Sequence, residues 1–406
     1  MPPEQTPDQE FLMNIENEIK ENLIDAVMTL YQYGCDDFEK LVQIELTRPE
    51  FEGDYTVIVF PLLKISGKSP VQTGGEIGDF IIKHNPLISG YKVIGGFLNL
   101  TVDCKYWLSF LNEINSDPYF WMAKNTGSSP TVMVEFSSPN TNKPLHLGHI
   151  RNILIGNSLA EILKAAGNNV IKTTLVNDRG IHICKSMLAW MKWGEGTAPD
   201  LGVKKGDHLV GDYYVLFEKE YEKQVRELTE KGLKPEEAEK TAPLLAEAQE
   251  LLIRWEANDP ETIALWKTMN SWVYDGFAKT YEKLNVQFDV TDYESEIFQL
   301  GRSIVLKGIV DGVFYLKKDG SVWIDLTDEG LDEKILLRSD GTSVYITQDI
   351  GTAHHRFNRF RLDRLIYVVG NEQNYHFKVL SLVLRKLGYS WAGNLHHLSY
   401  GMVELP

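Results

Sequence analysis

Cysteine is scarce in this chain of 406 residues. Its three cysteines, Cys35, Cys104 and Cys184, lie far apart and form no Cys-x-x-Cys pair. A sparse, odd-numbered set argues against a disulfide framework and is typical of reduced thiols in a cytosolic protein.

Long apolar runs are also missing from the sequence. The longest run, 57–63, contains Pro61 and is far shorter than the roughly 20 residues of a membrane-spanning helix. The first ten residues lack the basic start and the apolar stretch of a signal peptide. We therefore expect a soluble, cytoplasmic protein with no membrane partner.

Basic residues are outnumbered, with 41 Lys and Arg against 57 Asp and Glu and a net charge of −16. A general nucleic-acid coat needs a surplus of cations to displace counterions, so this class is excluded. The deficit is uneven, because 139–193 holds seven basic residues and two acidic ones, which permits a local basic cleft. The composition is otherwise ordinary and excludes collagen-like and wholly disordered chains, while the length predicts two or three domains.

The N-terminal segment, 1–125, is expected to form a small α+β domain. Helical spacing relates four apolar residues near its start, namely Phe11, Ile15, Ile19 and Leu23. Strand character follows at 41–46, at 55–60 and, after a glycine turn, at 97–100.

The remainder, 126–406, is predicted to be an α/β domain with a parallel sheet. A strand at 131–136, a polar loop, a helix starting near His146 and a strand at 170–176 make one β-α-β unit. The composition of an acidic segment at about 194–292 indicates a largely helical insertion. Sheet character then returns, in a hairpin at 312–324 and in strands at 344–347 and 365–369.

The sequence His146-Leu-Gly-His149 stands where the predicted helix begins. Backbone N–H groups and the helix dipole attract anions at such a place, and Gly148 would let a ligand approach the backbone. Three interpretations stay open for the two imidazoles: hydrogen bonds to nucleotide phosphates, a purely structural role, or metal binding, for which no further local ligands are evident.

A longer motif surrounds these histidines. The run Glu135-Phe-Ser-Ser-Pro-Asn-Thr-Asn-Lys-Pro-Leu-His-Leu-Gly-His-Ile-Arg-Asn152 closely resembles the signature of class I aminoacyl-tRNA synthetases, in the form carried by arginyl-tRNA synthetases. The segments 338–351 and 367–376 are also similar to motifs of that family, in the same order. The resemblance implies a Rossmann-like catalytic domain with a helical insertion, preceded by a small additional domain.

The resemblance also implies roles for individual residues. The arginine pocket matches Glu135, Ser138, Asn140, His149, Tyr345, Asp349 and Gln373. The ATP site matches Pro139, Asn140, His146, Gly148, His149 and His376. The catalytic groups match His146, His149 and Lys143, and the tRNA contacts match Phe97 and Asn99, which we expect to be exposed.

The chemistry implied is the activation of L-arginine with ATP and its transfer to the 3′ end of tRNA(Arg). Mg²⁺ is expected with ATP, no metal is expected to be tightly bound by the protein, and the enzyme is expected to be a monomer. A guanidinium is planar and always charged, so a selective pocket needs carboxylate and phenol oxygens. Tyr345 and Asp349 are expected to meet at a strand end.

Two other segments allow more than one interpretation. Asp178-Arg179-Gly180 is either a simple turn or a structural edge of the active site, and in either case Asn177 and Asp178 could pair with Arg179. The basic stretch 355–361 is either a solvated helix face or a contact for tRNA phosphates.

The family's lysine-rich KMSK-type loop and its anticodon-binding domain have no counterpart in the sequence. We therefore expect an N-terminal fragment that is inactive or weakly active. Two rival hypotheses remain: a class I enzyme for another amino acid, and a non-catalytic RNA-binding module that uses the same fold.

Overall fold

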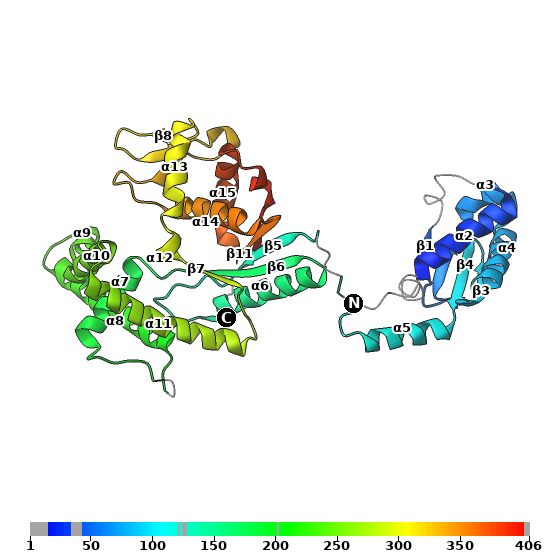
Figure 1. Cartoon of the computed structure of the whole chain (residues 1–406), viewed down its shortest axis with the longest axis horizontal. Coiled ribbons are helices and arrows are strands. Elements are labelled where there is room, and N and C mark those ends of the chain that lie inside the picture. The colour runs from blue at the N-terminus through cyan, green and yellow to red at the C-terminus, as the bar shows by residue number, and fades with distance from the viewer. Residues whose placement is uncertain (1–14, 34–42, 121, 124–127, 201–202, 402–406) are drawn as a thin grey trace. The chain divides into compact units, whose positions relative to one another are not determined.

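The computed structural model describes residues 15–33, 43–120, 122–123, 128–200 and 203–401. The chain forms two compact units, Met1–Trp121 and Met122–Pro406 (Figure 1). The expected domain boundary, at 125, and the position of Phe11 lie outside the described residues. None of the described helices is long and apolar enough to cross a membrane.

The first unit is an antiparallel sheet covered by helices. Its strand order is β1-β2-β4-β3, and the strands are β1 (Ile44–Leu46), β2 (Tyr55–Ile58), β3 (Ile88–Ile94) and β4 (Phe97–Val102). The helices are α2 (Ile15–Tyr31), α3 (Leu63–Ser66), α4 (Pro70–His84) and α5 (Cys104–Ser116). The predicted amphipathic helix is confirmed, because Ile15, Ile19 and Leu23 of α2 are buried in the core of this unit.

The second unit contains the predicted parallel sheet, in the strand order β12-β11-β5-β6-β7. The strands are β5 (Thr131–Glu135), β6 (Asn169–Val176), β7 (Val290–Tyr293), β11 (Arg364–Gly370) and β12 (Leu395–Tyr400). Four helices connect or flank them: α6 (Leu147–Ala165), α7 (Ile181–Trp193), α14 (Tyr345–Phe360) and α15 (Asn374–Lys386). In a parallel sheet the carboxyl ends of all strands meet at one edge, so the loops after β5, β6, β7 and β11 converge there.

A helical segment separates β6 from β7, as the sequence predicts. It contains α8 (Gly206–Glu230), α9 (Pro235–Thr241), α10 (Pro243–Glu256) and α11 (Pro260–Lys283), and these helices pack with α7 around a core of their own. Helix α11 leads into β7, whose residues Val290–Tyr293 pair with β6, so the segment at 290–292 belongs to the sheet and not to the insertion.

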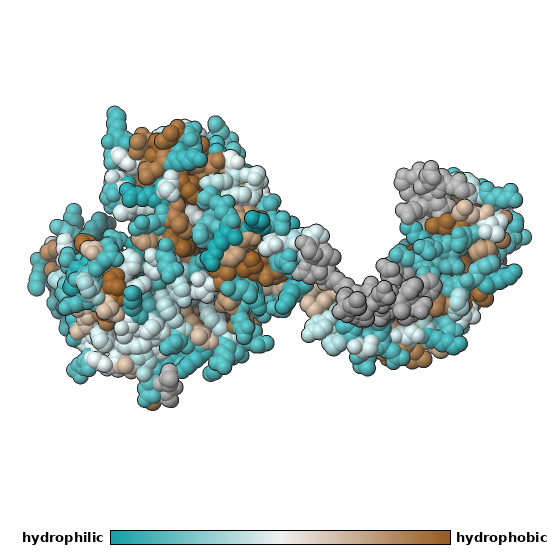
Figure 2. Space-filling model, in the orientation of Figure 1, coloured by the Kyte–Doolittle hydropathy of each residue, from teal (hydrophilic) through white to brown (hydrophobic). Residues whose placement is uncertain are grey.

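A second interruption stands between β7 and α14. Two short helices, α12 (Glu294–Ile297) and α13 (Leu300–Val310), precede a three-stranded antiparallel sheet of β8 (Tyr315–Leu316), β9 (Val322–Ile324) and β10 (Lys334–Leu337). The predicted hairpin at 312–324 is therefore confirmed. Leu306 and Val310 of α13 and Leu316 of β8 are exposed, and Figure 2 shows a hydrophobic patch in the part of the surface where α13 and β8 lie.

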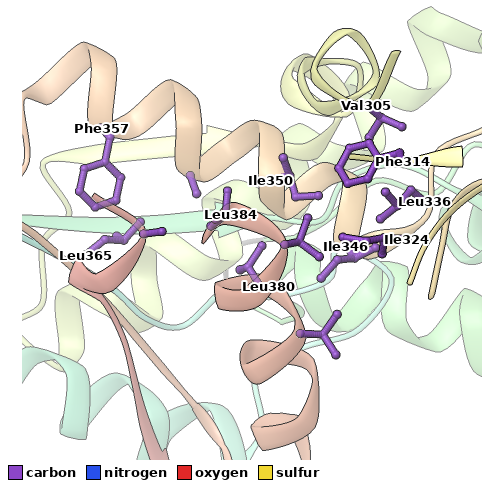
Figure 3. Packing of buried hydrophobic residues seen from close by; sticks show 14 of the residues in the cluster. Val305, Phe314, Ile324, Leu336, Ile346, Ile350, Phe357, Leu365, Leu380 and Leu384 are labelled. Atoms are coloured by element: carbon purple, nitrogen blue, oxygen red, sulfur yellow. The ribbon is translucent and has the colours of Figure 1, made fainter. Parts of the chain in front are cut away.

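The predicted strand at 344–347 is wrong, because α14 begins at Tyr345. Ile346, Ile350 and Phe357 point from one side of α14 into the largest cluster of buried apolar residues (Figure 3). Their spacing is helical, so burial of this stripe outweighs the strand preference of Val344, Tyr345 and Ile346. Tyr345 and Asp349 thus occupy the first turns of a helix and not a strand end.

Candidate active site

The loop after β5 turns sharply across the end of β6. Ser137 and Ser138 adopt positive φ angles of 73° and 41°, a conformation that costs free energy and recurs at functional sites. Hydrogen bonds hold the loop in place: Asn177 N–H donates to the Pro139 carbonyl at 2.9 Å, and Asn140 forms a parallel bridge with Asn177. The motif residues Ser138, Pro139 and Asn140 are thereby fixed at the carboxyl edge of the sheet.

Asn152 of α6 ties this loop to the strands behind it. Its Oδ1 accepts the Ser137 N–H at 2.5 Å, and its Nδ2 donates to the Val368 carbonyl at 2.6 Å and to the Tyr400 hydroxyl at 2.8 Å. Asn152 is buried. Apart from its place in the motif, nothing in the sequence indicates this positioning role.

The two motif histidines cap the N-terminus of α6. Nδ1 of His146 accepts the N–H of Gly148 at 3.2 Å, and Nδ1 of His149 accepts the N–H of His146 at 3.2 Å. The ring centroids are 4.0 Å apart. Because each Nδ1 is an acceptor, each neutral ring carries its proton on Nε2 and offers that N–H as a donor.

Both imidazoles are held neutral at physiological pH. Burial, with smaller contributions from the charges of His146 and Lys143, lowers the pKa of His149 to about 4. Burial and then the Lys143 charge lower the pKa of His146 as well. Lys143 therefore lies near enough to influence both rings electrostatically, so the three residues expected to be catalytic lie in one part of the structure. Within the described residues there is no group of three or more His, Cys, Asp or Glu that could hold a metal.

A second group of expected site residues gathers at the start of α14. His376 Nε2 lies 2.6 Å from Oδ2 of Asp349, and this hydrogen bond raises the pKa of His376. Asp349 also interacts electrostatically with Tyr367, the buried residue that pairs with Glu135 across β11 and β5. Glu135, Asp349 and His376 are thus brought to neighbouring positions.

Two expected pocket residues are open to solvent. The side chain of Tyr345 is 80% exposed, and Gln373, in the short helical turn Asn371–Gln373, is exposed as well. Tyr345 lines a cavity of about 1040 Å³ together with Glu294, Gln348 and Arg179.

Glu294 is a candidate residue that the sequence reasoning missed. It follows β7 directly, accepts a hydrogen bond from Gln348 Nε2 at 3.2 Å, and has a pKa raised mainly by burial. Asp349 and Asp178 raise this pKa further, whereas Arg179 lowers it. Its position at a strand end was the available signal, but the expected insertion, at about 194–292, includes most of the strand Val290–Tyr293.

Glu135 forms an ion pair with an arginine of the chain itself. Its Oε2 accepts Nη1 of Arg356, and its Oε1 accepts the Ser138 hydroxyl at 3.1 Å. Arg356 is fully buried and also binds Asp292, with Nη2 at 2.7 Å and Nε at 3.0 Å. Both interpretations of Arg356 from the sequence, a solvated helix face and a tRNA contact, are therefore wrong, because this side chain of α14 faces the sheet.

The Asp178–Gly180 turn also departs from expectation. Asp178 does not pair with Arg179; its carboxylate accepts hydrogen bonds from the hydroxyls of Tyr274 and Ser295 and from the Ser295 N–H, at 2.8–2.9 Å. Arg179 instead pairs with Glu256 at 2.9 Å and lies over the Phe298 ring. The turn therefore links the end of β6 to α10, α11 and α12, at the edge of the cavity that Tyr345 lines.

The two expected tRNA contacts in the first unit differ from each other. Phe97 is 42% exposed and packs edge-to-face on Phe60. Asn99 is only 3% exposed, and its Oδ1 accepts the Thr56 hydroxyl at 2.8 Å. The expectation that Asn99 is exposed is wrong, because its side chain accepts a hydrogen bond from a buried hydroxyl on the neighbouring strand.

Comparison with known proteins shows which family the chain resembles. Residues 117–405 match the family model described as class I (R) tRNA synthetases, catalytic domain. The chain is 56% identical over 394 residues to an arginine–tRNA ligase of Bacteroides thetaiotaomicron and 51% identical over 376 residues to one of Flavobacterium psychrophilum. These alignments cover 97% and 90% of this chain, and 66% and 63% of the relatives' own lengths.

Solved structures share the fold at lower sequence identity. The arginyl-tRNA synthetase of Thermus thermophilus superposes with a TM-score of 0.60 at 22% identity, covering 95% of this chain and 66% of that protein. The arginyl-tRNA synthetase of Plasmodium falciparum superposes with a TM-score of 0.57 at 18% identity, and the superposition covers 96% of this chain and 65% of that protein. By its family model and its sequence identity, this chain belongs to the class I arginyl-tRNA synthetases.

Proposed function

We propose that this chain contains the amino-acid activation site of an arginine–tRNA ligase, which joins L-arginine to the 3′ end of tRNA(Arg) at the expense of ATP. The similarity to arginine–tRNA ligases supports the proposal. The geometry that carries it is the combination of an anion-binding helix N-terminus, at His146 and His149, with the partly buried carboxylates of Glu294 after β7 and Asp349 on α14.

In the first step, a carboxylate oxygen of arginine attacks the α-phosphorus of ATP. The bond from that phosphorus to the bridging oxygen breaks, and pyrophosphate leaves with the electron pair. His146 and His149 donate Nε2–H hydrogen bonds to phosphate oxygens, and Lys143 adds a positive charge, while Pro139, Asn140, Gly148 and His376 border the nucleotide. Such a reaction depends mainly on positioning and on stabilisation of charge. Mg²⁺ would be held by the phosphates of ATP and would neutralise part of their charge.

The guanidinium of arginine pairs with carboxylates of the second group. Asp349 and Glu294 supply the negative charge, and Tyr345 and Gln373 supply further oxygen atoms near the pocket mouth. Charge-assisted hydrogen bonds of this kind contribute about 1.5–3 kcal/mol each. Glu135, Ser138 and Asn140, with His149, lie toward the reacting end of the substrate.

In the second step, a hydroxyl oxygen of the terminal ribose of tRNA attacks the carbonyl carbon of the adenylate. The carbon–oxygen bond to the phosphate breaks and AMP leaves. Phe97 of the first unit is exposed and is proposed to contact tRNA, whereas buried Asn99 is proposed to support its strand. The proposal includes a monomeric enzyme in the cytoplasm, which sedimentation and cell fractionation would test.

Calorimetric titration tests the guanidinium pocket without requiring turnover. We expect L-arginine to bind the 406-residue chain, and lysine and citrulline to bind at least about tenfold more weakly, because neither provides a charged planar donor. Equal binding of all three would overturn the assignment to arginine. Binding of tRNA without arginine or ATP would instead favour an RNA-binding module.

A matched pair of substitutions sharpens this titration. Asp349→Asn removes a proposed pocket carboxylate and is expected to abolish the preference for arginine while ATP still binds. The control is Asp332→Asn, because the carboxylate of Asp332 is 91% exposed. This substitution should leave the affinities for arginine and for ATP unchanged. Retention of full arginine preference in Asp349→Asn would exclude Asp349 from the pocket.

A further inference from the structure

Arg356 is the most deeply buried cation among the described residues, with 0% of its side chain exposed. It donates through all three of its nitrogen atoms, to Glu135 on β5 and to Asp292 on β7. These two carboxylates stand on strands separated by β6. One side chain of α14 therefore joins β5 to β7, near the candidate site.

The bridge is continuous with the proposed substrate pocket. Arg356 follows Asp349 by seven residues on α14, so both lie on the helix face that covers the sheet. Glu135 pairs in register with Tyr367 on one side and Thr173 on the other, and all three side chains are buried. The other oxygen of Glu135 accepts the hydroxyl of Ser138, in the strained loop that carries the motif.

Acidic groups crowd this edge of the sheet. Five carboxylates are buried or partly buried here, on Glu135, Asp178, Asp292, Glu294 and Asp349. Buried like charges disfavour each other's ionised forms, and a buried carboxylate without a cation is costly. Arg356 pairs with two of the five, and the hydroxyls of Tyr274 and Ser295 donate to Asp178. Glu294 and Asp349 are left with hydrogen bonds to Gln348 and His376, and neither has an Arg or Lys in an ion pair among the described residues, so these two meet an incoming cation.

We propose that Arg356 is a positioning residue for the arginine pocket: it fixes the carboxylate of Glu135 against Ser138, and it occupies Glu135 and Asp292 so that the substrate guanidinium pairs with Asp349 and Glu294. The inference rests on the proposed function, because it concerns how the same site selects its amino acid. Arg356 itself does not touch the substrate, since its side chain is enclosed by α14 and the sheet.

The test compares affinities for arginine and for ATP in the same variant. Arg356→Met keeps much of the side-chain length but removes the charge, and we expect the dissociation constant for arginine to rise at least about tenfold, as for loss of a group that orients a charged contact. The dissociation constant for ATP is expected to rise by a clearly smaller factor, because among the described residues no hydrogen bond joins Arg356, Glu135 or Asp292 to the cap at His146 and His149. Arg359→Met is the control, since Arg359 is exposed on the same helix.

Two further variants separate positioning from stability. Arg356→Lys keeps one charge and is expected to recover part of the arginine affinity. The double variant Arg356→Met with Asp292→Asn removes one of the two carboxylates left unpaired, so we expect it to regain thermal stability but not arginine affinity, because Glu135 is still unrestrained. If Arg356→Met does not fold, these two variants decide the question.

The outcomes are distinct. Unchanged arginine affinity in Arg356→Met, or full recovery of that affinity in the double variant, would overturn the positioning role. Equal loss of arginine and ATP binding in Arg356→Lys would also overturn it, since that is the result of general damage to the fold. Failure of the unmodified chain to prefer arginine would instead refute the proposed function.

Discussion

At the scale of single residues, protonation is set by what each side chain touches. The rings of His146 and His149 accept backbone N–H groups through Nδ1 and are partly removed from water beside Lys143. A protonated Nδ1 could not accept these bonds, so the neutral rings are built into the cap. This makes them fixed donors through Nε2 and not proton-transfer groups near pH 7.

The acid sensitivity of the fold follows from the lowered pKa of His149. An unfolded histidine takes up a proton near its ordinary pKa, whereas His149 in the folded chain resists protonation until about pH 4. The unfolded state therefore binds more protons between these values, and the free energy of unfolding falls as the pH falls through this window. When the pH is lowered from 6.5 to 4, we therefore expect the melting temperature of His149→Gln to fall less than that of the unmodified chain.

Thermal melts at several pH values check this expectation. The exposed His208 provides the control, because His208→Gln changes the same residue type on a different helix. Identical pH profiles for His149→Gln and the unmodified chain would show that the His149 ring is not buried in the neutral form.

At the scale of elements, Gly148 is required by the histidine cap. A Cβ atom at this position would lie 3.0 Å from Cε1 and 3.2 Å from Nδ1 of His146. The exposed ring can move aside, but it would then leave its hydrogen bond to the helix N-terminus, and loss of a cap costs about 1 kcal/mol. We expect Gly148→Ala to weaken ATP binding markedly and to lower stability modestly, as measured by calorimetry and thermal melts.

A helical glycine in the other unit provides the matched comparison. At Gly75 of α4 the nearest atom to an added Cβ would be the Tyr91 hydroxyl oxygen at 4.0 Å. Gly75→Ala should therefore stabilise the chain by about 0.5–1 kcal/mol, through helix propensity alone. If both substitutions had the same effect, the proposed steric role of Gly148 would be wrong.

The elements themselves were largely predictable from local pattern. Periodic apolar residues identified α2 and α6, and the β-branched runs identified β5, β6 and β11. The segment at 344–347 was misassigned because its local strand preference conflicts with the longer helical stripe of Ile346, Ile350 and Phe357. The burial of Arg356 and Asn99 was not predictable, because their partners are distant in the sequence. Arg356 pairs with residues 64 and 221 positions away, and Asn99 pairs with a residue 43 positions away.

At the scale of the whole molecule, topology turns scattered residues into one site. Glu135, Asp178, Glu294 and Asp349 are spread over more than half of the chain. Each nevertheless ends or follows a strand of the parallel sheet, or lies in the first turns of α14. The sequence predicted such an edge from the β-α-β pattern. It could not predict which carboxylates would pair with Arg356 and which with other groups, because that depends on the tertiary positions of Arg356 and His376.

The two compact units have separate hydrophobic cores, which predicts that they fold separately. Among the described residues, the core of the first unit runs from Ile15 to Tyr106, whereas the clusters of the second unit begin at Val132. All residues proposed to bind arginine and ATP belong to the second unit, Met122–Pro406. We expect this unit, expressed alone, to melt cooperatively and to bind arginine and ATP within about twofold of the affinities of the 406-residue chain, because distant and independent groups contribute additively. Affinity for tRNA(Arg) should fall, because Phe97 is absent; unchanged affinity for tRNA would contradict the proposed contact, and an unfolded second unit would contradict the independence of the cores.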